Sequence, residues 1–353
     1  MKNITKIIIY NFLILFILII IFELLFGYFL KPNNFGYMMR SERQKDQIYE
    51  VIHNEKKYRY HYKRNYYGFR GNEFLPSEIN IVFEGGSTGN QKFTPEELTI
   101  VGLLNLKFNQ TGKNFIIANA STDGKSTRGY INDLIYWFPK LKDFNPEFII
   151  FYTGINDSYL SHPLDYDLPW KDNFYSKFTD YLKNNSKIVE IFKQLKFTYF
   201  NKQVRLEYGV TRMDNNLYKD YQYINYRSAL DIHKNYTNKE LESQFDKRLE
   251  LLKKQINKFK FRPIFITQIN FDGLSNPDLF LINETLKNFC KKNNFSIIKL
   301  DEIIQNLDVN LFYDKMHTTP EGSVIISNKI YPQLLSIIEW RQKKPPKLLF
   351  QGF

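Results

Sequence analysis

The chain has 353 residues, of which 43% are hydrophobic and 17% aromatic, so it can bury a sizeable core and is not compositionally disordered. Its formal net charge of +12 could indicate an anionic partner. The basic residues are scattered and no nucleic-acid-binding motif is present, so the charge also fits a composition that is simply rich in lysine. The single cysteine, Cys290, excludes an internal disulfide and a thiolate metal cluster.

The N-terminal segment 7–30 is almost wholly apolar and is interrupted only by Asn11 and Glu23. As a helix, its 24 residues rise about 36 Å, enough to cross a hydrocarbon core of roughly 30 Å. No small-residue cleavage motif follows it. The pattern predicts an uncleaved membrane anchor, with a cleaved secretory peptide as the alternative.

The charges on either side of this segment bear on its orientation. Lys2 and Lys6 indicate that the short N-terminal tail stays in the cytoplasm. Four basic residues after the segment argue for the opposite orientation: Lys31, Arg40, Arg43 and Lys45. Because so short a tail usually remains inside, we expect a single-pass membrane protein whose main body lies outside the cytoplasm, in the periplasm or at the cell surface.

The remainder of the chain divides by composition into a stalk, a domain and a tail. Residues 31–78 are polar, aromatic and rich in turn residues, as expected for a stalk that ends by packing on a domain. Strand and helix patterns alternate over 79–340, with a long insertion at about 158–241. The lysine- and proline-rich residues 341–353 have the composition of a linker tail.

Five short buried strands are predicted in the domain, at residues 79–83, 115–118, 148–153, 264–267 and 297–300. Helices are expected between them, at 127 onward with a kink at Pro139, and at 245–259, 284–292 and 320–338. Two helix starts are predicted from caps, one at Thr94, followed by Pro95 and Glu97, and one at Thr319. Buried strands that alternate with helices predict an α/β fold whose parallel sheet is covered on both faces.

Four polar segments follow these strands or precede the last helix. The first, residues 84–89, reads Glu-Gly-Gly-Ser-Thr-Gly, and its glycines let the backbone turn tightly and expose the hydroxyl of Ser87. The others are residues 119–127, 154–157 and 314–317. Loops at the carboxyl ends of neighbouring parallel strands converge on one crevice, so we expect these four segments to meet. Each alone also fits a plain turn or a helix cap.

Together, the four segments resemble the signature blocks of the SGNH (GDSL-like) hydrolases, in order and in spacing, over residues 79–160 and 240–338. The resemblance implies a doubly wound, flavodoxin-like sheet of five parallel strands. It implies that Ser87 is the nucleophile, that His317 is its general base and that Asp314 orients the imidazole. The oxyanion hole is then formed by Ser87, Gly124 and Asn156.

Two features bear on this resemblance. The family's usual aspartate before the serine is Gly86 here, and a Gly-x-Ser-x-Gly pattern also occurs in the nucleophile elbow of α/β-hydrolases. We reject the elbow because only one strand precedes Ser87 and because Asp314 lies three residues before His317 rather than on an earlier loop. Aspartate and histidine at that spacing face the same side of a turn, so the carboxylate can set the tautomer.

The remaining histidines lack partners at ligand spacing, so we expect neither a metal nor a cofactor. They are His53 and His61 in the stalk, and His162 and His233 in the insertion. The insertion is also dense in tyrosines, namely Tyr218, Tyr221, Tyr223 and Tyr226. These indicate either ordinary packing or a lid beside the oxyanion loop.

The sequence therefore favours a serine esterase that forms an acyl-Ser87 intermediate and removes O-acyl groups, such as acetyl, from a cell-envelope glycan. An O-acyltransferase with the same intermediate is the alternative, as is a lysophospholipase or thioesterase, since the anchor keeps the site near lipid. The middle segments are similar to the lysophospholipase and thioesterase members of the family. A non-catalytic glycan-binding scaffold is the remaining alternative.

Overall fold

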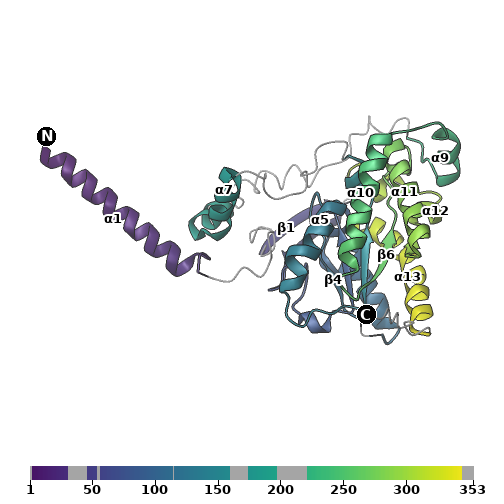
Figure 1. Ribbon diagram of the computed structural model, residues 1–353, viewed down its shortest axis with the longest axis horizontal. Helices are drawn as coiled ribbons and strands as arrows, with labels where there is room; N and C mark the ends of the chain where they lie inside the picture. The colour runs from purple at the N-terminus through teal and green to yellow at the C-terminus, as the bar shows by residue number, and fades with distance from the viewer. Residues whose placement is uncertain are drawn as a thin grey trace, which may run out of the picture.

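The computed structural model describes residues 2–30, 46–53, 56–113, 115–159, 174–196 and 221–343 (Figure 1). A long helix at the N-terminus projects away from an α/β domain, in which helices lie on both sides of a central sheet. Parts of the predicted insertion and tail lie outside the described residues, and so do His162 and Tyr218. The same holds for the four basic residues that follow the apolar segment.

The sheet contains five strands, all parallel, in the spatial order β4-β3-β5-β6-β7. Its strands in chain order are β3 (Ile81–Gly85), β4 (Ile117–Asn119), β5 (Phe148–Tyr152), β6 (Arg262–Ile266) and β7 (Ser296–Ile298). Each predicted strand is present within two residues at its ends, and the order is that of a flavodoxin-like, doubly wound sheet. The predicted fold class is confirmed.

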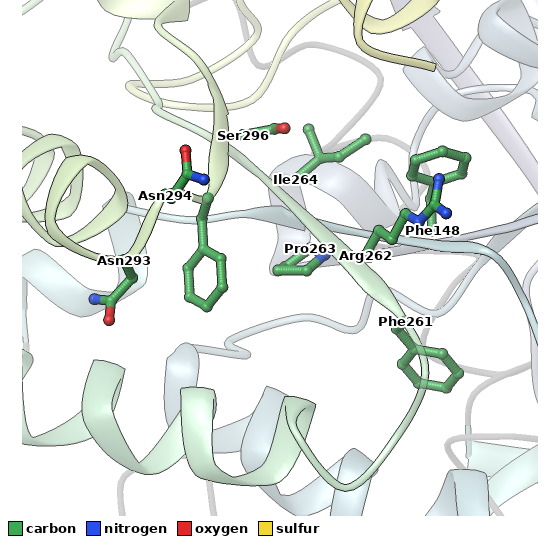
Figure 2. A pocket seen from close by; sticks show the side chains of 9 residues that line it. Phe148, Phe261, Arg262, Pro263, Ile264, Asn293, Asn294 and Ser296 are labelled. Atoms are coloured by element: carbon green, nitrogen blue, oxygen red, sulfur yellow. The ribbon is translucent and has the colours of Figure 1, made fainter. Parts of the chain in front are cut away.

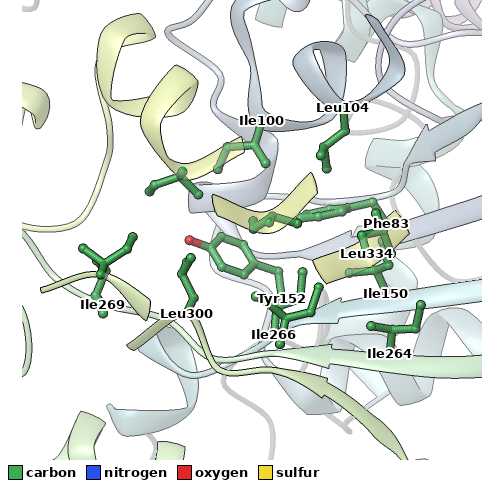
Figure 3. Packing of buried hydrophobic residues seen from close by; sticks show 14 of the residues in the cluster. Phe83, Ile100, Leu104, Ile150, Tyr152, Ile264, Ile266, Ile269, Leu300 and Leu334 are labelled. Atoms are coloured by element: carbon green, nitrogen blue, oxygen red, sulfur yellow. The ribbon is translucent and has the colours of Figure 1, made fainter. Parts of the chain in front are cut away.

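Two hydrophobic cores lie on opposite faces of the sheet, because successive side chains of a strand point to opposite sides. In β5, Ile150 and Tyr152 face the core formed with α4 (Ile100–Gln110) and α13 (Pro320–Lys343), part of which Figure 3 shows. Ile149 and Phe151 face the other core, formed with α5 (Thr127–Asn132), α10 (Lys239–Ile256) and α11 (Pro277–Asn293). These strands are apolar on both faces, which explains why they appear as continuous hydrophobic runs.

Side-chain caps start several of the helices, and one predicted cap is wrong. The hydroxyl of Thr319 accepts from the N–H of Gly322 and caps α13, as expected. The helix expected from Thr94 begins instead at Ile100, and Thr99 caps it by accepting from Gly102. Residues Glu96–Leu98 form only a 3₁₀ turn, and the side chain of Glu96 is drawn into an ion pair with Arg70 at 2.6 Å. A tertiary contact thus overrides the local capping signal.

The apolar N-terminal segment forms α1 (Lys2–Phe26), which begins earlier and ends four residues sooner than the predicted 7–30. Within it, residues Ile4–Phe26 are long and apolar enough to cross a membrane. Their side chains are exposed, so the helix does not form part of the domain core.

The segment 31–78, which its composition predicts to be a stalk that ends by packing on the domain, contains a pair of antiparallel strands. Strands β1 (Asp46–His53) and β2 (Lys56–Lys63) pair along their full length. The chain then packs on the domain, where the N–H of Arg70 donates to Asn119 O at 2.8 Å and the guanidinium of Arg64 donates to Ser121 O at 2.6 Å. Both arginines are buried.

Candidate active site

The four polar segments meet at the carboxyl ends of the strands, as the sequence predicts. Ser87 opens the short helix α3 (Ser87–Asn90) directly after β3, and Asn156 lies in α6 (Ile155–Ser158) directly after β5. The order of the sheet reverses direction at β3, so the crevice beside it is where ligands bind in open α/β sheets. His317 reaches this crevice from the loop that precedes α13.

Ser87, His317 and Asp314 form a continuous chain of hydrogen bonds. The Oγ of Ser87 lies 2.6 Å from Nε2 of His317, and Nδ1 of the same ring lies 2.6 Å from Oδ2 of Asp314. When Nδ1–H donates to the carboxylate, Nε2 is left as the acceptor for the serine hydroxyl. The arrangement therefore gives the imidazole the tautomer that a general base requires.

The carboxylate of Asp314 is itself held in place. Its Oδ1 accepts from the backbone N–H groups of Met316 and His317 at 2.9 and 2.8 Å. Burial acts to raise the pKa of Asp314, but the hydrogen bond and charge of His317, together with these two N–H donors, outweigh it and hold the pKa below its ordinary value. Asp314 is consequently ionised near pH 7.

Tyr313 and His53 lie behind this pair. The ring of Tyr313 stacks on that of His317 at 5.4 Å and 7°, and the ring of His53 lies 5.3 Å from Tyr313. The hairpin that carries His53 is fixed here because a ring nitrogen of His53 lies 2.8 Å from Phe93 O. Burial lowers the pKa of His53, so its ring is neutral near pH 7. The hairpin thus supports the imidazole from behind, a role not apparent from its stalk-like composition.

Asn156 occupies the space beside the nucleophile. Its side-chain Nδ2–H donates to Lys125 O at 2.8 Å, which leaves its second amide proton available. A Cβ on Gly86 would stand 2.0 Å from that nitrogen, so only glycine before the serine leaves room for this amide. Gly124, next to Lys125, has a φ of 75° that favours glycine. A side chain at position 86 would therefore displace this amide.

A buried cluster of charges ties the oxyanion loop to the strand that carries the nucleophile. Nζ of Lys125 donates to Glu84 at 2.7 Å, to Asp133 at 2.5 Å and to Ala120 O at 2.7 Å. All three charged side chains are at most 3% exposed. Glu84 is in β3 and Asp133 follows α5, so the ammonium group holds the loop 120–127 between them.

Two glutamines that the sequence analysis missed connect the site's segments. Gln268, after β6, donates to Thr88 Oγ1 at 2.8 Å and accepts from the N–H of Ile155 at 2.7 Å. Gln91, at the end of α3, donates to Thr318 Oγ1 at 2.9 Å beside the general base. Neither residue stands in a recognisable motif, because each is defined by partners that lie far away in the sequence.

The other candidate sites carry no comparable chemistry. A hollow of about 220 Å³ opens at the amino ends of β5, β6 and β7, the edge of the sheet opposite to Ser87 (Figure 2). The one charged residue that lines it, Arg262, is paired with Glu147 at 3.1 Å. Across the described ranges, no three His, Cys, Asp or Glu side chains converge as metal ligands do.

No family model matches the sequence, and no curated protein matches it. Among solved structures, the chain is similar to an α/β hydrolase enzyme from the metagenome of Lake Arreo (12% identity, 74% of this chain and 96% of that chain, TM-score 0.41). It is also similar to a member of the lipolytic G-D-S-L family from Veillonella parvula (15% identity, 72% of this chain and 97% of that chain, TM-score 0.40). A third similar structure is a catalytic mutant of an acetylxylan esterase from Geobacillus stearothermophilus (13% identity, 72% of this chain and 93% of that chain, TM-score 0.41).

These similarities are distant in sequence and partial in geometry. The chemistry of the chain is set by the side chains around Ser87. They provide a hydroxyl, an oriented base and an amide donor within one crevice, which is the set of groups that acyl transfer through a serine requires.

Proposed function

We propose that this chain is a serine esterase of the SGNH type that acts through an acyl-Ser87 intermediate. The observation that carries the proposal is the contact of 2.6 Å between Ser87 Oγ and His317 Nε2, in a ring whose other nitrogen is bound to a carboxylate. A serine hydroxyl is a weak nucleophile unless such a base takes its proton.

In the first half of the reaction, Ser87 Oγ attacks the ester carbonyl carbon while its proton passes to His317 Nε2. The resulting oxyanion is bound by the backbone N–H groups of Ser87 and Gly124 and by the free amide proton of Asn156. The tetrahedral species collapses, the alcohol leaves with the proton from Nε2, and the acyl group remains on Oγ. Water then attacks the acyl carbon while its proton passes to Nε2. Ser87 Oγ leaves with that proton, and the acid is released.

The substrate class in the proposal is an O-acyl ester, such as an acetyl ester, of a cell-envelope glycan. It follows from a membrane anchor in α1 that holds the domain outside the cytoplasm. The apolar length of Ile4–Phe26 and the lysines at positions 2 and 6 support that anchor and its orientation.

Product analysis on an acetylated envelope glycan tests this proposal. We expect free acetate to appear at the rate at which acetyl esters disappear, and Ser87→Ala to abolish both. Acetyl groups that move to a second glycan without release of acetate would instead identify an acyltransferase with the same intermediate. Loss of acetyl esters that continues in Ser87→Ala would contradict the proposed nucleophile.

A further inference from the structure

The apolar helix α1 contains a carboxylate, Glu23, close to its C-terminal end. Its oxygens accept from Ser186 Oγ at 2.6 Å, from the N–H of Lys187 at 2.8 Å and from the N–H of Ile188 at 3.1 Å. Glu23 thereby caps the helical segment 187–196, which belongs to the insertion between β5 and β6. An acidic residue that is costly inside an apolar span is thus used to hold a distant part of the chain.

Backbone contacts strengthen this junction. The N–H of Tyr28 donates to Asn185 O at 2.8 Å, at the end of α7 (Phe174–Asn185). A Cβ on Gly27 would stand 3.0 Å from the same oxygen and 2.3 Å from Glu23 O, so glycine permits the close approach. In Figure 1, α7 lies beside the C-terminal end of α1 and apart from the sheet. The two helices of the insertion therefore sit where the apolar span ends.

Both helices of the insertion expose apolar side chains at helical spacing. In α7, Phe174, Phe178 and Tyr181 are 84%, 49% and 52% exposed. In the segment 187–196, Phe192 and Leu195 are 68% and 62% exposed. Large aromatic residues are unfavourable at such exposure in water, but they are favoured at the boundary between headgroups and acyl chains.

The same two helices are rich in lysine. Residues 174–196 contain five lysines against one aspartate and one glutamate, a net charge of +3. Helices that combine exposed aromatic residues with a lysine-rich composition are typical of elements that lie in the plane of a membrane and contact anionic headgroups. The charge thus favours a lipid surface over an apolar protein groove as the partner.

We propose that α7 and the segment 187–196 form an interfacial platform that lies on the surface of an anionic phospholipid bilayer beside α1. This inference rests on the proposed membrane anchoring of α1 and is independent of the proposed esterase activity.

The test uses the full chain, reconstituted into vesicles of phosphatidylcholine and phosphatidylglycerol, with a fluorescent label on one introduced cysteine. Phe178→Cys and Phe192→Cys place the label on the platform, whereas Leu15→Cys places it on α1 and Tyr66→Cys on the exposed surface of the domain. Cys290 is fully buried, so the unsubstituted chain measures the background. Each label is quenched separately with a nitroxide lipid and with aqueous iodide.

We expect the labels at positions 15, 178 and 192 to be quenched by the lipid and that at position 66 by iodide. Glu23→Leu should abolish the lipid quenching at positions 178 and 192 and leave that at position 15. Lipid quenching at 178 and 192 that is unchanged in Glu23→Leu would overturn the role of Glu23. Iodide quenching at 178 and 192 with lipid quenching at 15 would overturn the platform alone. Iodide quenching at 15 would overturn the anchor and the inference with it. Protection from both quenchers would mean that protein covers this face, which also contradicts the proposal.

Discussion

The imidazole of His317 is bound at both nitrogens, but its two partners have different tasks. In the proposed reaction, Ser87 exchanges a proton with Nε2, whereas Asp314 keeps its charge and holds Nδ1–H in place. Because the pKa of Asp314 is held below its ordinary value, this carboxylate stays ionised through the cycle and stabilises the imidazolium that forms.

We therefore expect Asp314→Asn to lower kcat/KM on a simple acetyl ester, by up to about 10⁴, but by less than His317→Ala. The double variant should be no slower than His317→Ala alone, because residues that act as one unit are not additive. Full activity in His317→Ala would place the base elsewhere.

Gly86 gives a second prediction at this scale. A methyl group there would occupy the position of the Asn156 amide, so Gly86→Ala should displace the amide donor without removing it. We expect kcat to fall by about 10²–10³, as for loss of one oxyanion donor, with KM little changed. Asn156→Ala should give a similar loss, and combining the two changes should add little. If Gly86→Ala lowers the kcat of an Asn156→Ala enzyme by a further factor of about 10²–10³, the two residues act separately.

At the scale of elements, the site depends on how the loop after β4 is fastened to β3. Lys125 pairs with two buried carboxylates, and removing it leaves both without their cation. Lys125→Met should lower the free energy of unfolding by about 3–5 kcal/mol. Lys113→Met, which breaks the exposed ion pair with Glu339, is the control and should cost less than about 1 kcal/mol. Denaturant unfolding followed by circular dichroism measures both, and equal losses would contradict the role of the buried cluster.

The elements that could be predicted from the sequence are those with local causes. The five strands are short apolar runs, and the four polar segments lie where each run stops, so both could be predicted without knowing the fold. The helix predicted to start at Thr94 starts at Ile100 instead. Arg70, which lies outside the local window, binds both Thr94 O and the Glu96 carboxylate. The hairpin was missed because β2 alternates aromatic with basic residues, and β1 has apolar residues on both its buried and its exposed face.

The positions of Gly86, Gln268 and His53 were equally inaccessible to local patterns. Each acts through a partner on another segment: the Asn156 amide, the hydroxyl of Thr88 and the ring of Tyr313. The spacing of residues along the sequence does not predict such contacts. The Glu23 junction is a similar case, since a lone acid in an apolar run indicates a partner but does not identify it.

At the scale of the whole molecule, an anchor in α1 predicts that the domain and the C-terminus share one side of the membrane. With the N-terminal tail in the cytoplasm, that side is the outside. An alkaline phosphatase fused after Phe353 should then be active, because it folds only outside the cytoplasm. A cytoplasm-only reporter that works at the same position would reverse the orientation and remove the basis for an envelope glycan as substrate.

The proposed reaction depends on acylation of Ser87, and locating the residue that an active-site reagent modifies tests this step. The full chain is treated with a fluorophosphonate, which reacts with a serine only when a base activates it, and the adduct is located by peptide mass spectrometry. We predict a single adduct on Ser87, and its loss in His317→Ala, whose Ser87 hydroxyl is intact but lacks its base. An adduct on another serine, or undiminished labelling of Ser87 in His317→Ala, would contradict the account.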